Sequence, residues 1–127
     1  MYLFARLAER WPVEVVPGVS SLTACAAAAA APLAARNDIL MVVPATLDEH
    51  RLLARLAITD AAAIIKLGRH FNKVLRVLRK LGLVDRARYI AHATMPNQEI
   101  QRLEAVDATE VPYFSMILLH RRGDAWR

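Results

Sequence analysis

Glycine is scarce in this chain, with only four among 127 residues. Neither a P-loop nor a G-x-G-x-x-G turn is present, so the usual glycine-rich phosphate sites are excluded. Aromatic residues make up only 6% of the sequence, and the core must therefore consist mainly of Leu, Ile and Val. The single cysteine, Cys25, cannot form an internal disulfide, and its place in an apolar helix predicts a buried structural thiol rather than a reactive one.

Long hydrophobic runs are also missing. The most apolar stretch, residues 22–33, is well short of the roughly 20 residues that a membrane-spanning helix needs. The amino terminus lacks the basic and apolar regions of a signal peptide. These features predict a cytoplasmic protein with no membrane partner.

Metal and nucleic-acid sites are disfavoured by the placement of the polar residues. The four histidines lie in different predicted elements without the paired spacing of metal ligands, so no metal site is predicted. The net charge is +5, but the basic residues are scattered and lack the interleaved aromatics of a nucleic-acid surface. This charge is explained by solvated Lys and Arg side chains, or it steers a polyanionic small molecule.

Hydrophobic patterning predicts alternating helices and strands. Strands are expected over residues 13–16, 39–43, 61–66, 88–93 and 113–119. Helices are expected over residues 2–10, 21–31, 71–81 and 97–104. One more helix is expected to follow the capping box formed by Thr46 and Glu49. This order predicts the α/β class, with a mixed sheet and helices on both faces. The continuous apolar strand 113–119 is expected to be buried on both of its faces.

The motif at residues 13–21 reads Val-Glu-Val-Val-Pro-Gly-Val-Ser-Ser and predicts a strand, a turn and a helix start. Such a junction offers backbone N–H groups and hydroxyls to a polar ligand. Three further motifs follow it, at residues 64–68 (Ile-Ile-Lys-Leu-Gly), 93–98 (Ala-Thr-Met-Pro-Asn-Gln) and 113–119 (Tyr-Phe-Ser-Met-Ile-Leu-Leu). In this order the four motifs resemble the second half of a tetrapyrrole (corrin/porphyrin) methylase, most closely those that methylate C20 of precorrin-2.

The resemblance implies transfer of a methyl group from S-adenosylmethionine to C20 of precorrin-2, or of cobalt-factor II, in cobalamin biosynthesis. It implies cofactor contacts from four residues, Ser20, Ser21, Leu67 and Ala93, and a substrate pocket shaped by Ser115 and Met116. No catalytic residue is assigned, because the electron-rich ring carbon itself attacks the methyl group. Bringing two substrates into line is then the main task of the protein.

The resemblance covers residues 2–120 but only half of a family member, and the glycine-rich and G-D-P motifs of the other half are missing. We therefore expect a fragment that is inactive alone. Residues 1–19 would end an amino-terminal domain and its linker, residues 20–127 would form the carboxyl-terminal α/β domain, and the intact protein would be a homodimer. Two alternatives stay open: a methylase acting at another corrin carbon, and a non-catalytic interaction or dimerisation domain. An upstream reading frame encoding the missing motifs would favour the enzyme.

Overall fold

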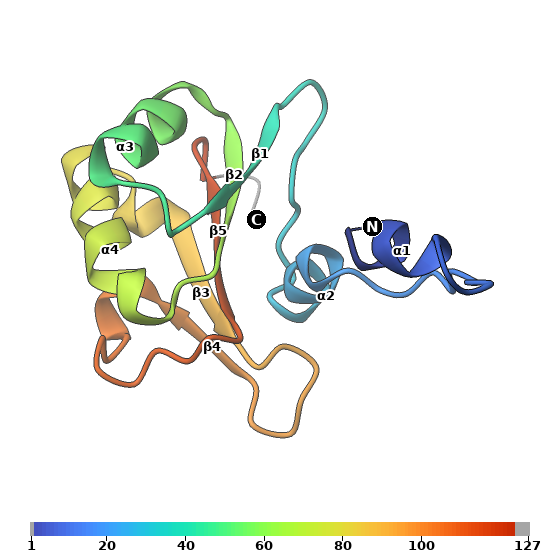
Figure 1. Ribbon diagram of the computed structural model, residues 1–127. Coiled ribbons are helices and arrows are strands. Elements are labelled where there is room, and N and C mark those ends of the chain that lie inside the picture. The colour runs from blue at the N-terminus through green and yellow to red at the C-terminus, as the bar shows by residue number, and fades with distance from the viewer. Residues whose placement is uncertain (1, 124–127) are drawn as a thin grey trace.

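A mixed sheet of five strands forms the centre of the fold in the computed structural model, which describes residues 2–123 (Figure 1). The strands lie in the order β1-β2-β5-β3-β4, where β1 is Leu40–Pro44, β2 Ala61–Ile65, β3 Ala87–Ala91, β4 Glu99–Arg102 and β5 Ser115–His120. Strands β1 and β2 are parallel, and the other neighbouring pairs are antiparallel. The carboxyl ends of β1, β2 and β3 therefore meet at one edge of the sheet.

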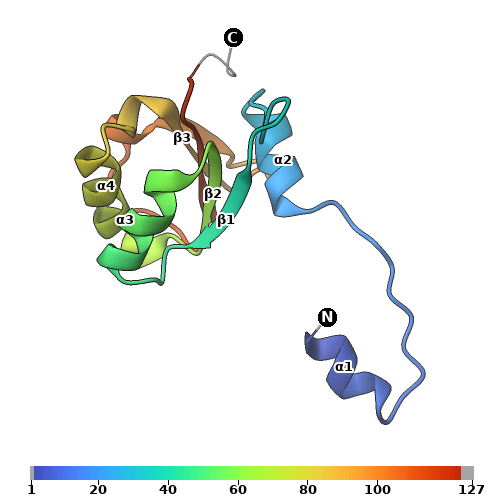
Figure 2. The ribbon, with the colours of Figure 1, turned by 90° about the horizontal axis from the view of Figure 1, so that it is seen from above.

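Helices cover both faces of this sheet, which confirms the predicted α/β class. Helices α3 (Glu49–Ile58) and α4 (Phe71–Lys80) lie on one face, and α2 (Ser21–Ala28) lies on the other (Figure 2). Helix α1 (Tyr2–Ala8) lies apart from the sheet in both views and is joined to α2 by an extended segment.

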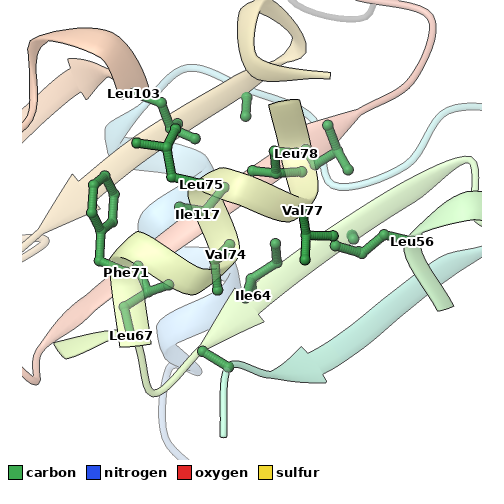
Figure 3. Packing of buried hydrophobic residues seen from close by; sticks show 14 of the residues in the cluster. Leu56, Ile64, Leu67, Phe71, Val74, Leu75, Val77, Leu78, Leu103 and Ile117 are labelled. Carbon is green, nitrogen blue, oxygen red and sulfur yellow. The ribbon is translucent and has the colours of Figure 1, made fainter. Parts of the chain in front are cut away.

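The larger core cluster lies between the sheet and the pair α3 and α4 (Figure 3). Helix α4 presents the predicted stripe to it: Phe71, Val74, Leu75 and Leu78 are buried, and Leu81 packs at its margin. The ring of Phe71 meets that of Tyr89 edge to face, with centroids 5.9 Å apart. Gly82 follows the helix with φ +66°, a left-handed conformation that favours glycine as a helix stop.

The smaller core cluster lies under α2 and is built from less bulky residues. It consists of Cys25, Ala63, Ile90, Met116 and Leu118. Burial raises the pKa of the Cys25 thiol and leaves the residue 5% exposed, which confirms that this cysteine is buried. Because alanine side chains are short, α2 can approach the sheet closely while burying little apolar area.

Several sequence-based predictions of local structure are wrong. Residues 13–16 form no strand, since they are not beside another strand and leave Val15 and Val16 exposed. The segment 97–104 contains β4 and the start of a 3-10 turn instead of a helix, because residues 99–102 pair with β3. The N-cap of α3 is Asp48 instead of Thr46, and its carboxylate accepts a hydrogen bond of 2.8 Å from the Arg51 N–H.

The remaining differences concern element ends. Helix α2 ends at Ala28, several residues before the expected stop, and α1 ends at Ala8. Strand β5 begins at Ser115, two residues later than predicted, and Tyr113 and Phe114 are exposed ahead of it. All six residues of β5 are buried, as the continuous apolar run predicts.

A polar network fastens the end of β5 to the loop before β1. Nε2 of the fully buried His120 lies 2.8 Å from a carboxylate oxygen of Asp38, and the Arg122 guanidinium lies 2.5 Å from the other oxygen. Chiefly through the Arg122 hydrogen bond, with help from the Ala35 N–H and His120, these contacts lower the pKa of Asp38 to about 2. The network joins segments that are more than 80 positions apart in the chain.

Replacing Leu78 by alanine should strongly destabilise the fold. Leu78 is 0% exposed in the centre of the larger cluster, and large-to-small changes at such sites cost about 2–5 kcal/mol. The exposed Ile58, at 73%, provides the control, because I58A removes little buried surface. Urea unfolding of both variants measures the difference, and equal losses would contradict this account of the core.

The variant D38N should lose stability at neutral pH but not in acid. An unfolded aspartate has a pKa of about 3.9, whereas the pKa of Asp38 is lowered to about 2. The stabilisation is therefore complete above about pH 4 and is lost as the pH falls through 2. Urea unfolding across this range should show the two proteins converging. The control is D85N, because Asp85 is exposed and its side chain has no hydrogen bond or ion pair with another residue of 2–123. Equal stability of D38N and the original chain at pH 7 would contradict the role of the network.

Candidate functional site

A hollow of about 680 Å³ opens at the edge of the sheet where β2 and β3 end. We call it the edge hollow. It lies on the α2 side. Its wall comes from α2 and Val19, two residues before it, from the end of β2 and the loops after β2 and β3, and from the start of β5 with the residues ahead of it: Val19, Ser21, Ala24, Cys25, Ile65, Lys66, His92, Ala93, Thr94, Met95, Tyr113, Phe114, Ser115 and Met116. Four segments that are distant in sequence thus meet at one place.

The two serines at the start of α2 differ in position. Ser20 is the N-cap, and its Oγ accepts a hydrogen bond of 3.2 Å from the Leu22 N–H. Its carbonyl oxygen accepts a second one, of 2.9 Å, from the Thr23 hydroxyl. Ser21 is the first residue of the helix and lines the edge hollow, whereas Ser20 is not among the described residues of that wall.

The other predicted site residues divide in the same way. Ala93, Ser115 and Met116 line the edge hollow. The Ser115 hydroxyl donates to the Pro112 carbonyl at 2.6 Å, so its proton is already engaged within the protein. Leu67 is 0% exposed in the larger core cluster, on the other face of the sheet, and packs beneath α4 (Figure 3).

Three residues of the edge hollow have a left-handed backbone, which is uncommon outside glycine. They are Lys66 at φ 60°, His92 at φ 50° and Thr94 at φ 66°, three of the five such non-glycine residues that the structure describes. Strained conformations of this kind persist where surrounding contacts impose them, and they cluster at functional sites. Sequence reasoning missed Lys66 and His92, because it placed both within the predicted strands 61–66 and 88–93, whereas the structure ends these strands at Ile65 and Ala91.

Backbone contacts fix the loop that follows β3. The His92 N–H donates to the Phe114 carbonyl at 2.9 Å, and the Thr94 N–H donates to the side chain of Gln98 at 2.7 Å. The first bond continues the pairing of β3 with β5 beyond Ala91. The loop is therefore held in one shape against the start of β5.

The rim of the edge hollow is apolar and exposed. Tyr113 and Phe114 are 67% and 68% exposed, and their rings meet edge to face with centroids 5.5 Å apart. Met95 is half exposed beside the same space. Flat apolar ligands stack favourably on aromatic surfaces of this kind.

The electrostatics of the edge hollow favour an anionic or neutral ligand. Lys66 is the one permanently charged residue of the described wall, which contains no carboxylate. The raised pKa of the Cys25 thiol keeps it protonated at neutral pH, so it is a poor nucleophile there. The space is thus suited to binding and orienting a ligand that is partly apolar and partly anionic.

Two further classes of site are not found in residues 2–123. No group of three or more His, Cys, Asp or Glu side chains is arranged to hold a metal ion. None of the described helices is both long and apolar enough to cross a bilayer.

Comparison with known proteins gives the chain close relatives. It is 42% identical over 119 residues to the precorrin-2 C(20)-methyltransferase of a Sinorhizobium species, covering 94% of this chain and 49% of the relative. The match to the cobalamin biosynthesis protein CobIJ of Mycobacterium bovis is also 42%, over 23% of that protein. The cobalt-precorrin-2 C(20)-methyltransferase of Salmonella typhimurium is 32% identical, with 53% of it covered. The chain therefore spans about half the length of the two single-function relatives.

Solved structures share its fold. A cobalt precorrin-4 methyltransferase, CbiF, superposes with a TM-score of 0.73 at 22% identity, over 97% of this chain and 57% of that one. The uroporphyrin-III C-methyltransferase of Thermus thermophilus, solved with S-adenosylhomocysteine, gives a TM-score of 0.63 at 26% identity, over 94% and 57%. A model of the tetrapyrrole (corrin/porphyrin) methylases matches residues 1–108. With this match over most of its length, the chain belongs to the tetrapyrrole methylase family.

Proposed function

We propose that this chain is part of a precorrin-2 C20-methyltransferase that uses S-adenosylmethionine, with precorrin-2 or its cobalt-containing counterpart as methyl acceptor. The proposal rests on one observation: residues from four separate family-like motifs, among them Ser21, Ala93 and Ser115, line a single hollow. The 42% identity to a precorrin-2 C(20)-methyltransferase over 94% of the chain supports this choice of substrate.

The edge hollow fits part of a methyl donor. Its volume of about 680 Å³ lies within the 300–1,000 Å³ of small-molecule sites, and its wall is mainly apolar with a few polar groups. The Thermus relative was solved with S-adenosylhomocysteine, the demethylated donor, which supports the same ligand class here. Of the six predicted contact residues, we propose Ser21, Ala93, Ser115 and Met116 as direct ones. Ser20 and Leu67 would act by holding α2 and the strand end in place.

Methyl transfer of this kind depends more on positioning the two substrates than on acid–base catalysis. S-adenosylmethionine supplies an electrophilic methyl group on sulfur, which passes to the ring carbon as the carbon–sulfur bond breaks. The residues of this chain would orient the donor from one side. Fixed orientation of the reactants lowers the entropic part of the activation free energy. Strand ends and a firmly bonded loop provide such a rigid wall.

We also propose that residues 1–19 belong to an amino-terminal domain and its linker, and that residues 20–127 form the carboxyl-terminal domain, whose last four residues lie outside the described range. The exposed apolar side chains of this first segment, including Leu3, Trp11 and Val16, support the division. Apolar surface of that extent is usually covered by protein. In the intact enzyme we expect it to be covered by further domain structure and by the second subunit of a homodimer, in the cytoplasm.

Joining residues 1–127 to the amino-terminal half of the Sinorhizobium relative should restore methyl transfer. The product should gain one methyl group by mass spectrometry, and NMR should place it at C20. Methylation at another ring carbon would favour the alternative family activity. A folded chimera that binds both substrates without transferring a methyl group would favour a non-catalytic interaction domain.

The isolated chain should bind S-adenosylmethionine more weakly than 1 μM, which corresponds to about −8 kcal/mol. It spans about half of its relatives, so we expect part of the cofactor cleft to come from segments outside it. Isothermal titration calorimetry measures the affinity. Micromolar or tighter binding would mean that the cleft lies within these 127 residues.

Single alanine variants should distinguish the roles of Ser20 and Ser21. Loss of the Ser20 cap should cost about 1 kcal/mol of stability, whereas S21A should lower cofactor affinity at least about tenfold. Both are measured in the chimera, with thermal melting as the folding check. If a folded S21A variant kept full affinity, Ser21 would have only a structural role.

A further inference from the structure

Lys66 and His92 share an unusual position in the edge hollow. Each directly follows a strand, β2 or β3, and these strands flank β5 on its two sides. Both residues line the hollow and both have a left-handed backbone. The ends of β2 and β3, on the two sides of β5, therefore each contribute one nitrogen-bearing side chain to the hollow.

Neither side chain has a bonding partner within residues 2–123. No hydrogen bond or ion pair joins the Lys66 ammonium group to a described residue. The Nδ1 atom of His92 is buried and lacks a hydrogen-bond partner there. Because the protein shields Nδ1, a ligand in the hollow meets the other atoms of the half-buried imidazole, which lines the wall.

The Lys66 side chain is exposed and therefore available to a ligand, and the left-handed backbones of Lys66 and His92 are what indicate a binding role. Local folding alone would favour Gly or Asn at a left-handed position, and a lysine at φ 60° gains nothing from its own backbone. A neutral imidazole can donate one hydrogen bond and an ammonium group three. No carboxylate in the described wall competes for them.

We propose that Lys66 and His92 together bind a carboxylate group of the ligand. This inference rests on the proposed function, because both methylation substrates carry carboxylates. The group comes either from the amino-acid end of the methyl donor or from a side chain of the macrocycle. In both cases the charge-assisted hydrogen bonds hold the carboxylate end of the ligand while its apolar part lies against the rim at Tyr113 and Phe114.

NMR titration of the full 127-residue chain tests the pair, since it measures weak as well as tight binding. Three probes separate the two sources: S-adenosylhomocysteine, 5′-methylthioadenosine, which lacks the amino-acid end, and uroporphyrin, a macrocycle with carboxylate side chains. The variants are K66M and H92F. Their controls outside the described wall are R69M, with the same loss of charge, and H50F, with the same loss of an imidazole.

We expect K66M and H92F to weaken binding of a carboxylate probe about tenfold, and R69M and H50F to leave it unchanged. Weaker binding of S-adenosylhomocysteine with unchanged methylthioadenosine binding would assign the donor carboxylate. Weaker uroporphyrin binding alone would assign the macrocycle. Unchanged affinity for all probes in folded K66M and H92F would overturn the inference. If H92F does not fold, H92N replaces it, because asparagine tolerates a left-handed backbone.

Failure of the proposed function is measured separately, in the chimera, which would then transfer no methyl group. If the 127-residue chain alone binds none of the three probes, the pair can still be tested with sodium citrate, by following the ring nitrogen shifts of His92. Saturable shifts that vanish in K66M but persist in R69M would uphold a carboxylate site independent of methyl transfer. The absence of any shift in the original chain would overturn it.

Discussion

The insertion of β5 between β2 and β3 is the interaction on which the rest of the structure depends. This strand comes from the end of the described chain, yet it occupies the middle of the sheet and pairs along both of its edges. All six of its residues are buried, and each apolar one contributes to one of the two core clusters. Without β5, the parallel pair β1–β2 and the hairpin β3–β4 would have no shared edge.

The position of β5 also creates the candidate site. Its first residue lies between the ends of β2 and β3, so the loops that leave those strands must diverge around it. Lys66 and His92 take left-handed conformations at these turns, and the His92 N–H remains bonded to the chain just before β5. Tyr113 and Phe114 face outward where the chain enters the sheet. The polar and the aromatic parts of the site thus both result from the position of β5 between β2 and β3.

The two faces of the sheet are packed differently, and the difference bears on ligand binding. Large side chains from α3 and α4 form the larger core cluster on one face. The face under α2 contributes Ala63, Ile90, Met116 and Leu118 to a smaller cluster around Cys25, and α2 covers only part of this face. Short side chains leave room at the end of the helix that bulkier ones would occupy. We expect ligands to bind on this less filled side, as the proposed function requires.

Local patterns in the sequence determined the elements whose interactions are themselves local. The periodicity of 71–81, the glycine that ends it and the apolar strand runs predicted α4, β1, β2, β3 and β5, because burial of one face depends on side chains that recur at fixed spacing. The motifs also predicted Ser21, Ala93, Ser115 and Met116, which the fold brings to one hollow. Their proposed contacts with a cofactor remain a prediction.

Tertiary structure alone decided the rest. Residues 13–16 have strand-forming side chains but no neighbouring strand, whereas residues 99–102 have few of them and pair with β3 because that edge is open. Leu67 belongs to the core and not to the hollow because the chain turns sharply after Lys66. The unpartnered nitrogen of His92 likewise depends on what surrounds it in the fold. Pairing, burial and backbone strain result from contacts between distant segments, and no local pattern of residues encodes them.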